Sequence, residues 1–384
     1  MKYTRRLHLA ALASLAAALI TACGGGSNFF DDRIEVTRVV VAGDSLADAG
    51  TFGYKFTVQN SAAPAAGFPI FTELVAQEFD VNAQCNYFAY NGTTFVQNAQ
   101  AGCTNYAVGG GRIVNTAAQG GAASPFSIPF QLATAASVVG NYGPKDLVVV
   151  DGGGNDAADL VTAFLGATDA AGAAVYEAFL LQQVDRVTLD AMLAQPDGAV
   201  VAGSRYMTNL ADTFANAINT NVIAKGAVHV AVLNMPDITL TPRFQAVLAQ
   251  VSQANGGGTA GGQAAAQLQA VIRQWIGSFN TRLSNNLRSD TRIVLVDFNA
   301  DFTDEVNNPA KYGVTNVRDS ACTVAGINDV RLCTTTALEA NRPAGAAAGW
   351  WQTYAFSDGF HPTPLGHRLL ADTVLRALEK EGWL

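Results

Sequence analysis

Residues 34–45 read IEVTRVVVAGDS, and the fold interpretation starts from this stretch. Residues 34–42 form a short apolar run rich in β-branched side chains, which is typical of a buried strand. Gly43, Asp44 and Ser45 follow directly, so a serine is expected at a turn between a strand and a helix. This position, at the carboxyl edge of a sheet, suits a nucleophile whose product is an oxyanion. A turn in which Ser45 caps the helix would explain the same residues.

Three further runs have the same character and predict three more strands, at residues 146–151, 226–233 and 292–298. Between the last two, apolar residues recur at the spacing of one helical face, which predicts a long helix there. The residues of that face are Leu268, Val271, Ile272, Trp275, Ile276, Phe279 and Leu283.

Two other helices are expected, at residues 205–224 and 364–381. The second has Thr363 as its N-cap and Pro364 at its first helical position. Strands that alternate with helices predict a mostly parallel sheet covered on both faces, which is an α/β sandwich. In such sheets, ligands bind beyond the carboxyl ends of the strands.

The chain shows no clear boundary between domains after its N-terminal segment, so residues 33–384 are expected to form a single domain. The glycine-rich residues 255–262 (NGGGTAGG) are interpreted as a surface loop before the long helix. Residues 157–200 are less regular, and they are a candidate insertion over the site.

The composition supports a large core, because 49% of the residues are hydrophobic and 14% are charged. Acidic side chains number 31 against 23 basic ones, for a net charge of −8. A surface so poor in cations disfavours a nucleic-acid partner. No obligate protein partner is evident from the sequence.

The first residues predict export. Basic residues precede an apolar stretch of about 14 residues, which is too short to span a bilayer and suits a secretory signal. The stretch ends in Ile20-Thr21-Ala22-Cys23, which resembles a bacterial lipobox. We therefore expect a lipoprotein signal peptide at 1–22, a lipidated Cys23 and a flexible tether through residue 32. Gly24 favours anchoring in the outer membrane, and ordinary cleavage with secretion is the alternative.

The remaining four cysteines fit the same compartment, because an even number in an exported chain indicates disulfides. They form two local couples, Cys85 with Cys103 and Cys322 with Cys333. Three pairings are possible, and the local one closes short loops. Metal binding is the rival interpretation, but no C-x-x-C pair or adjacent histidine supports it.

Two glycine-rich segments could also contribute to a site. Residues 105–111 (NYAVGGG) contain three consecutive glycines, which allow close backbone approach to a ligand and expose N–H donors. Residues 152–156 (GGGND) follow a predicted strand and would leave the amide of Asn155 facing the crevice. A flexible turn and a helix cap by Asn155 or Asp156 are the respective structural alternatives.

One histidine is suited to act as a base. His229 lies in an apolar strand and His367 in the last helix, so both are expected to serve packing. His361 lies outside a regular element, with Asp358 three residues before it. A serine hydroxyl needs such a base, and the imidazole needs a third group that fixes its tautomer.

Taken in order, the four segments make the chain resemble the SGNH/GDSL hydrolase superfamily of lipases and esterases. The matching blocks are residues 43–48, 105–111, 152–156 and 357–363, and residues 308–317 resemble secreted bacterial members. Ala47 departs from a serine that is frequent in these lipases.

The resemblance implies a role for each matching residue. Ser45 corresponds to the nucleophile, His361 to the general base and acid, and Asp358 to the residue that orients the histidine. The oxyanion donors would be the backbone N–H groups of Ser45 and Gly110 and the side-chain amide of Asn155. Gly110 is preferred to its neighbour because it lies five residues after the asparagine of its block.

The resemblance also implies a flavodoxin-like, three-layer α/β/α sandwich with about five mostly parallel strands. The implied activity is hydrolysis of carboxylic esters or lipids, including phospholipids, without metal or organic cofactor. A lipid acyltransferase and a carbohydrate acetylesterase are alternatives on the same site. A surface lipoprotein that only binds its ligand is disfavoured, since every matching catalytic residue is present.

Overall fold

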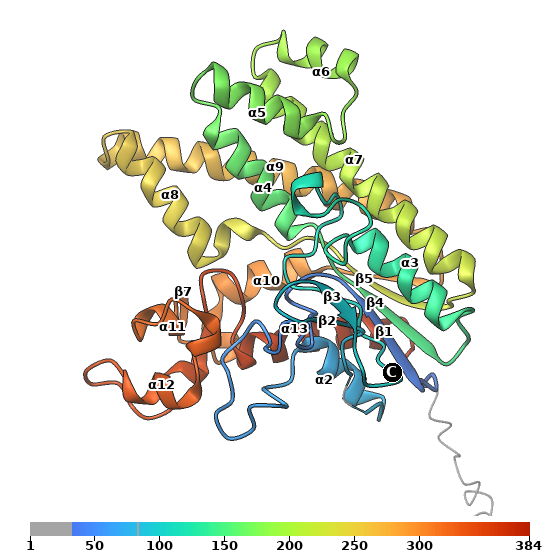
Figure 1. The fold of residues 1–384 in the computed structure, drawn as a ribbon. Coiled ribbons are helices and arrows are strands. Elements are labelled where there is room, and N and C mark those ends of the chain that lie inside the picture. Colours follow the sequence, from blue (N-terminus) through green and yellow to red (C-terminus); the bar gives the residue numbers. More distant parts are fainter. Residues whose placement is uncertain (1–32, 83) are drawn as a thin grey trace, which may run out of the picture.

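A parallel sheet lies at the centre of the molecule (Figure 1). The computed structural model describes residues 33–82 and 84–384, and in this part of the chain the sheet has four strands in the order β1-β4-β5-β6. Their bounds are Arg38–Ala42 for β1, Asp146–Val150 for β4, His229–Leu233 for β5 and Ile293–Val296 for β6. Each strand falls inside one of the four apolar runs of the sequence, so these predictions are confirmed with shorter bounds.

A short segment around Asn105 extends the sheet to a fifth position, where it pairs with β1 through one isolated bridge. Val41 donates a backbone hydrogen bond to Thr104 (3.0 Å) and accepts one from Tyr106 (2.7 Å), so residues 104–106 run parallel to β1 at its free edge. With this segment counted, the order across the sheet is 2-1-3-4-5, which is the flavodoxin-like order.

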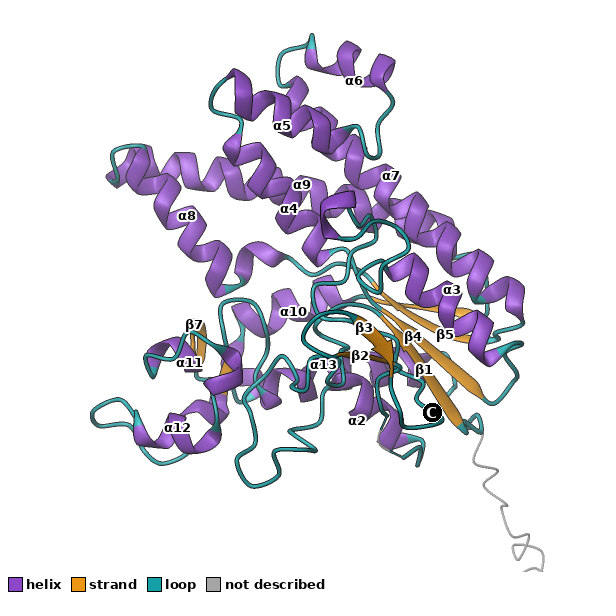
Figure 2. Cartoon of the chain, in the orientation of Figure 1, coloured by secondary structure: helices purple, strands orange, loops and turns teal. Residues whose placement is uncertain are grey.

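Side chains alternate between the two faces of the sheet and form two separate cores. Val40 and Val148 belong to the core on one face, and Val39 and Val149 belong to the core on the other. The first core includes α3 (Ile128–Val139), α4 (Gly154–Gly166), α7 (Gly198–Asn221) and α9 (Gly258–Leu287). The second includes α2 (Phe71–Glu78), α10 (Phe298–Asn307) and α13 (Pro364–Lys380). The predicted α/β/α sandwich is therefore confirmed (Figure 2).

The predicted helices are present, with one difference at a glycine-rich segment. At α13, Thr363 is the N-cap, and its hydroxyl accepts a hydrogen bond from the Gly366 N–H (3.3 Å). Residues 255–262 were expected to form a loop, but residues 258–262 are the start of α9. Glycine is required there because a Cβ on Gly261 would lie 2.2 Å from the Ser252 carbonyl oxygen of α8 (Pro242–Ala254). Gly261 thus allows α8 and α9 to pack closely.

Residues 157–200 are regular rather than irregular. They hold most of α4, then α5 (Ala170–Leu180), α6 (Arg186–Leu193) and the start of α7. Asp169 and Asp185 cap α5 and α6 by accepting hydrogen bonds from backbone N–H groups. Figure 1 shows α5 and α6 at the end of the molecule away from the sheet.

Two small sheets and two disulfides complete the architecture. β2 (Phe88–Tyr90) pairs antiparallel with β3 (Phe95–Gln97), and β7 (Asn316–Ser320) pairs parallel with β8 (Tyr354–Phe356). Two short helices, α11 (Ala321–Val324) and α12 (Thr335–Ala340), follow β7. The disulfides join Cys85 to Cys103 and Cys322 to Cys333, which confirms the local pairing.

The predicted signal peptide (1–22) and the tether with Cys23 (23–32) lie outside the described residues. Among the helices of the described part, none combines the length and the apolar character needed to cross a membrane. The assignment of residues 33–384 to a single domain stays a prediction.

A buried ion pair fixes the long connection between β1 and α2. The Lys55 ammonium donates to both carboxylate oxygens of Glu73 (2.8 and 2.7 Å) and to the carbonyl of Ala66 (2.8 Å). Both side chains are at most 10% exposed. This connection carries Phe56, whose ring lies 5.0 Å from that of His361.

We expect Lys55→Met to lower the free energy of unfolding by about 3–5 kcal/mol, because it leaves the Glu73 carboxylate buried without its partner. Chemical denaturation followed by circular dichroism measures this loss. The matched control is Arg331→Met, which removes an exposed partner of Asp329 and should cost at most about 1 kcal/mol. Equal losses in the two variants would contradict the prediction.

Candidate active site

The turn after β1 holds Ser45 at the carboxyl edge of the sheet. The Gly43 N–H donates to the side-chain oxygen of Gln131 (2.8 Å), and the Leu46 N–H donates to the Asp44 carboxylate (3.0 Å). Glycine is needed at position 43, because a Cβ there would lie 1.7 Å from a carboxylate oxygen of Asp151. Ser45 is 4% exposed and lines a cavity on this side of the sheet.

The structure brings Ser45 together with His361 and Asp358. Nε2 of His361 lies 2.8 Å from the Ser45 hydroxyl, and its Nδ1 lies 2.7 Å from an Asp358 oxygen. With the Nδ1 proton donated to Asp358, Nε2 is the acceptor for the serine hydroxyl. Burial opposes ionisation of Asp358, but the charge and hydrogen bonds of His361 dominate and lower the pKa of that carboxyl.

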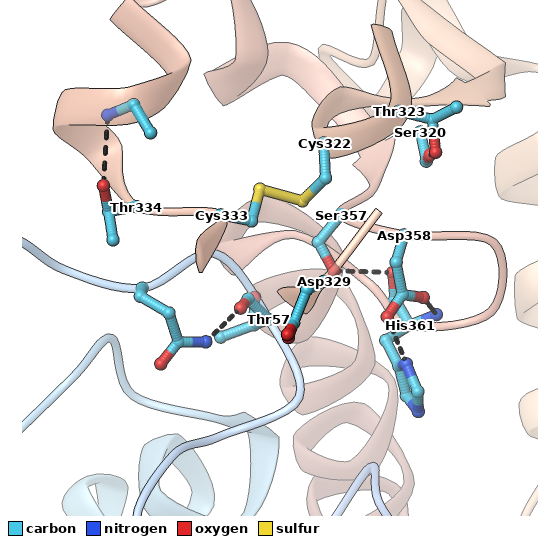
Figure 3. Close-up of a disulfide and its surroundings, with 12 residues drawn as sticks. Thr57, Ser320, Cys322, Thr323, Asp329, Cys333, Thr334, Ser357, Asp358 and His361 are labelled. Atoms are coloured by element: carbon cyan, nitrogen blue, oxygen red, sulfur yellow. Dashed lines mark hydrogen bonds and ion pairs between the residues drawn. A yellow bond between two sulfur atoms is a disulfide. The ribbon is translucent and has the colours of Figure 1, made fainter. Parts of the chain in front are cut away.

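A tight turn next to a disulfide holds Asp358 and His361 in place (Figure 3). Asp358 also accepts hydrogen bonds from the backbone N–H groups of Phe360 and His361, both at 2.8 Å. Ser357 donates from its N–H (2.8 Å) and its hydroxyl (3.0 Å) to the His361 carbonyl. The Cys322 N–H donates to the Ser357 carbonyl (2.9 Å). The disulfide between Cys322 and Cys333 is therefore attached to the turn that carries Asp358 and His361.

The three-glycine segment presents one N–H group without an acceptor. The Gly109 N–H donates to Asp48 (2.7 Å), and the Gly111 N–H donates to the Val108 carbonyl (2.8 Å). For the Gly110 N–H, the described residues offer no acceptor. Gly110 has a φ of +81°, a conformation that favours glycine.

Neighbouring charged groups fix the Gly110 peptide. Arg112 donates to the Gly110 carbonyl (2.5 Å) and pairs with Asp159 of α4 (2.6 Å). Asp156 accepts from the N–H groups of Ile113 and Val114 (3.0 and 2.9 Å). The loop is thereby attached to α4 at two places.

Asn155 lies in the first turn of α4 and connects the same loops. Its Nδ2 donates to the Gly111 carbonyl (3.0 Å) and lies 3.5 Å from an Asp44 oxygen. The N-cap of α4 is Gly153, and no side chain caps this end. The interpretation of Asn155 or Asp156 as a helix cap is therefore wrong.

A buried carboxyl pair that the sequence did not predict, Asp44 with Asp151, lies next to Ser45. Asp44 and Asp151 are 6% and 4% exposed, their carboxyls interact closely, and Oδ1 of Asp151 has no hydrogen-bond partner among the described residues. Burial, followed by the adjacent Asp44 charge, raises the pKa of Asp151 well above its ordinary value. A proton held by Asp151 allows the two carboxyls to coexist. Two aspartates at the ends of neighbouring strands were the available signal.

The cavity beside Ser45 is largely apolar. Its wall includes Leu46, Ile238, Phe298, Phe302, Phe356 and Leu370, together with the side chain of Glu305. Residues 157–200 do not contribute to this wall in the described structure, so the proposed insertion over the site is not seen there.

The other two histidines serve packing. His367 is fully buried, its Nδ1 accepts from the Phe71 N–H (3.4 Å), and burial lowers its pKa to about 3. The His229 ring packs against Trp383 with centroids 4.8 Å apart. Within residues 33–82 and 84–384, no cluster of three or more His, Cys, Asp or Glu side chains is suited to hold a metal ion.

Comparison with known families gives one match. The family model described as GDSL-like Lipase/Acylhydrolase aligns with residues 39–374, which include all the residues of the site described above. A search among curated proteins found no match. The chain therefore belongs to the GDSL-like lipase/acylhydrolase family, and its general activity is that of an ester hydrolase.

Proposed function

We propose that this protein cleaves carboxylic esters by a serine mechanism, as a lipase or esterase that acts on acyl lipids. The observation that supports this most directly is the hydrogen-bonded series of Ser45, His361 and Asp358 beside an apolar cavity. Nucleophile, base and orienting group are thus within the reach that acyl transfer requires.

In the acylation step, the Ser45 oxygen attacks the ester carbonyl while Nε2 of His361 takes its proton. Asp358 keeps the imidazole in the required tautomer and stabilises the imidazolium. His361 then gives this proton to the leaving alkoxide. In the second step the same imidazole activates a water molecule, which releases the acyl group and restores the Ser45 hydroxyl.

Three donors would stabilise the oxyanion, namely the N–H groups of Ser45 and Gly110 and the amide of Asn155. The free N–H of Gly110 supports its choice over Gly109, whose N–H is bound by Asp48. For Asn155, the amide hydrogen directed to Asp44 is the available one, because the 3.5 Å separation is at the limit of a hydrogen bond.

The apolar wall supports an acyl chain rather than a sugar as the group that enters the cavity. This makes a lipase, esterase or phospholipase the leading proposal, with a carbohydrate acetylesterase as the alternative. A lipid acyltransferase would use the same residues, with an alcohol in place of water in the second step.

We also propose that Cys23 carries lipid and anchors the protein to the outer membrane. The lipobox-like residues 20–23 support this, and the two disulfides agree with an oxidising compartment. Cys23→Ser should move the protein from the membrane fraction to the soluble exported fraction in a bacterial host. Membrane recovery equal to that of the wild type would contradict the proposal.

Ser45→Ala should abolish turnover of p-nitrophenyl esters with C2 to C16 acyl chains, because it removes the hydroxyl on which the acyl-enzyme is proposed to form. Steady-state kinetics across the series also gives the preferred chain length. The matched control is Ser278→Ala, which removes an exposed hydroxyl on α9 and should retain full activity. Turnover by a folded Ser45→Ala protein would refute the serine mechanism, and a new ester formed with added alcohol would identify an acyltransferase.

Asn155→Ala should lower kcat by a factor on the order of 100–1000, since one oxyanion donor is lost. The same kinetic assay measures it, with thermal unfolding as a check of folding. Asn286→Ala is the control, because its amide donates to Asp212 between α7 and α9. A loss below about threefold would exclude Asn155 from the oxyanion site.

A further inference from the structure

One glutamate interrupts an otherwise apolar face of α10. Phe298, Phe302, Glu305 and Val306 all line the cavity that contains Ser45. Their spacing of i, i+4, i+7 and i+8 places them on one side of the helix. An apolar side chain would be expected at position 305, because the other three members of this face are apolar.

The Glu305 carboxyl has no partner in the described part of the chain. Its side chain is about nine-tenths buried, with 9% exposure, and no described N–H or O–H group donates to it. Arg376 of α13, whose charge acts on Glu305, is bound to Asp301 (2.7 Å) and Thr373 (3.0 Å). A carboxyl in an otherwise apolar cavity wall, with no described protein partner, is available to a hydrogen-bonding group of a ligand that enters the cavity.

The surroundings of Glu305 raise its pKa, so that a large fraction of the carboxyl keeps its proton near pH 7. Burial is the main cause that raises its pKa to about 7, and the charge of Asp301 adds to it. The positive charge of Arg376 lowers this pKa, whereas the negative charges of Asp372 and Asp304 raise it further. A carboxyl that holds its proton can donate a hydrogen bond as well as accept one.

We propose that Glu305 determines substrate specificity by binding a hydroxyl group on the acyl chain, so that the enzyme prefers esters of hydroxylated fatty acids. This inference rests on the proposed ester hydrolysis at Ser45. A hydroxyl group both donates and accepts, so it matches the carboxyl in either protonation state. The adjacent Phe298, Phe302 and Val306 match the methylene groups of such a chain, whereas a cation would lose its hydration against them.

The test compares ethyl decanoate with ethyl hydroxydecanoates that carry the hydroxyl at carbon 3, 6, 9 or 10. The full-length protein is assayed at pH 7 by titration of the released acid. At least one hydroxylated ester should have a kcat/KM on the order of 10–100 times that of ethyl decanoate, because the plain chain leaves the carboxyl unpaired. Glu305→Leu should reverse this preference, and Glu305→Gln should retain it, since its amide also donates and accepts.

Glu379→Leu is the matched control, since it makes the same change at an exposed glutamate of α13 that does not line the cavity. In this control, the kcat/KM for the preferred hydroxylated ester divided by that for ethyl decanoate should stay within about twofold of the wild-type ratio. Wild-type hydrolysis of all five esters at equal rates, or a preference that survives Glu305→Leu, would overturn this inference and leave the proposed function intact. Absence of hydrolysis of every ester would overturn both.

Stability gives a readout that does not depend on turnover. The pKa of Glu305 is about 7 in the folded protein against an ordinary value of 4.5, so the folded state holds this proton more tightly. The resulting stability is present below about pH 4.5 and is lost as the pH rises through 7. The melting temperature of the wild type should therefore fall relative to Glu305→Gln between pH 5 and 8. If the difference in melting temperature between the two proteins stayed constant from pH 5 to 8, it would contradict the buried, unpaired carboxyl on which the inference depends.

Discussion

The parallel pairing of β1 with β4 is the constraint on which the site depends. Because Ala42 pairs with Val150, the two strands end together, and their following loops leave the sheet side by side. One loop carries Asp44 and Ser45, and the other carries Asp151 and leads into α4, whose first turn holds Asn155. The close contact of the loops explains the need for Gly43, where any side chain would meet the Asp151 carboxylate.

Buried carboxylates hold the loops around the junction where β1 and β4 end. Asp48 accepts hydrogen bonds from Gly50, Thr51 and Gly109, and Asp156 accepts from two N–H groups of the glycine-rich loop. These bonds satisfy backbone donors in segments that have no ladder partner. They also select which N–H stays free, since Gly109 is bound and Gly110 is left for a ligand. Some of the acidic residues that make a nucleic-acid partner unfavourable thus have a structural use inside the site.

Sequence periodicity predicted the four strands, α7, α9 and α13, because each depends on a local pattern of burial. It could not predict the edge segment at residues 104–106, which pairs through one bridge, or the helical start of α9, which depends on contact with Ser252. Physical reasoning about the residues singled out Ser45 and the Asp358–His361 pair as candidates, and the family resemblance assigned them to one site. The Asp44–Asp151 pair and Glu305 were missed because each becomes unusual only when its neighbours in space are known.

Ser45 and the residues of α10 line the same cavity but come from opposite ends of the sheet. Ser45 follows β1, whereas α10, which supplies Phe298, Phe302 and Glu305 to the cavity, follows β6 on the opposite side of the sheet order. The α10 residues proposed to bind the acyl chain and the residues proposed to carry out the reaction therefore belong to different segments of the chain. A change on α10 can alter the cavity without altering the strand pairing that positions Ser45 and Asn155. This separation is why substitution at Glu305 is expected to change the preferred ester while the oxyanion donors stay in place.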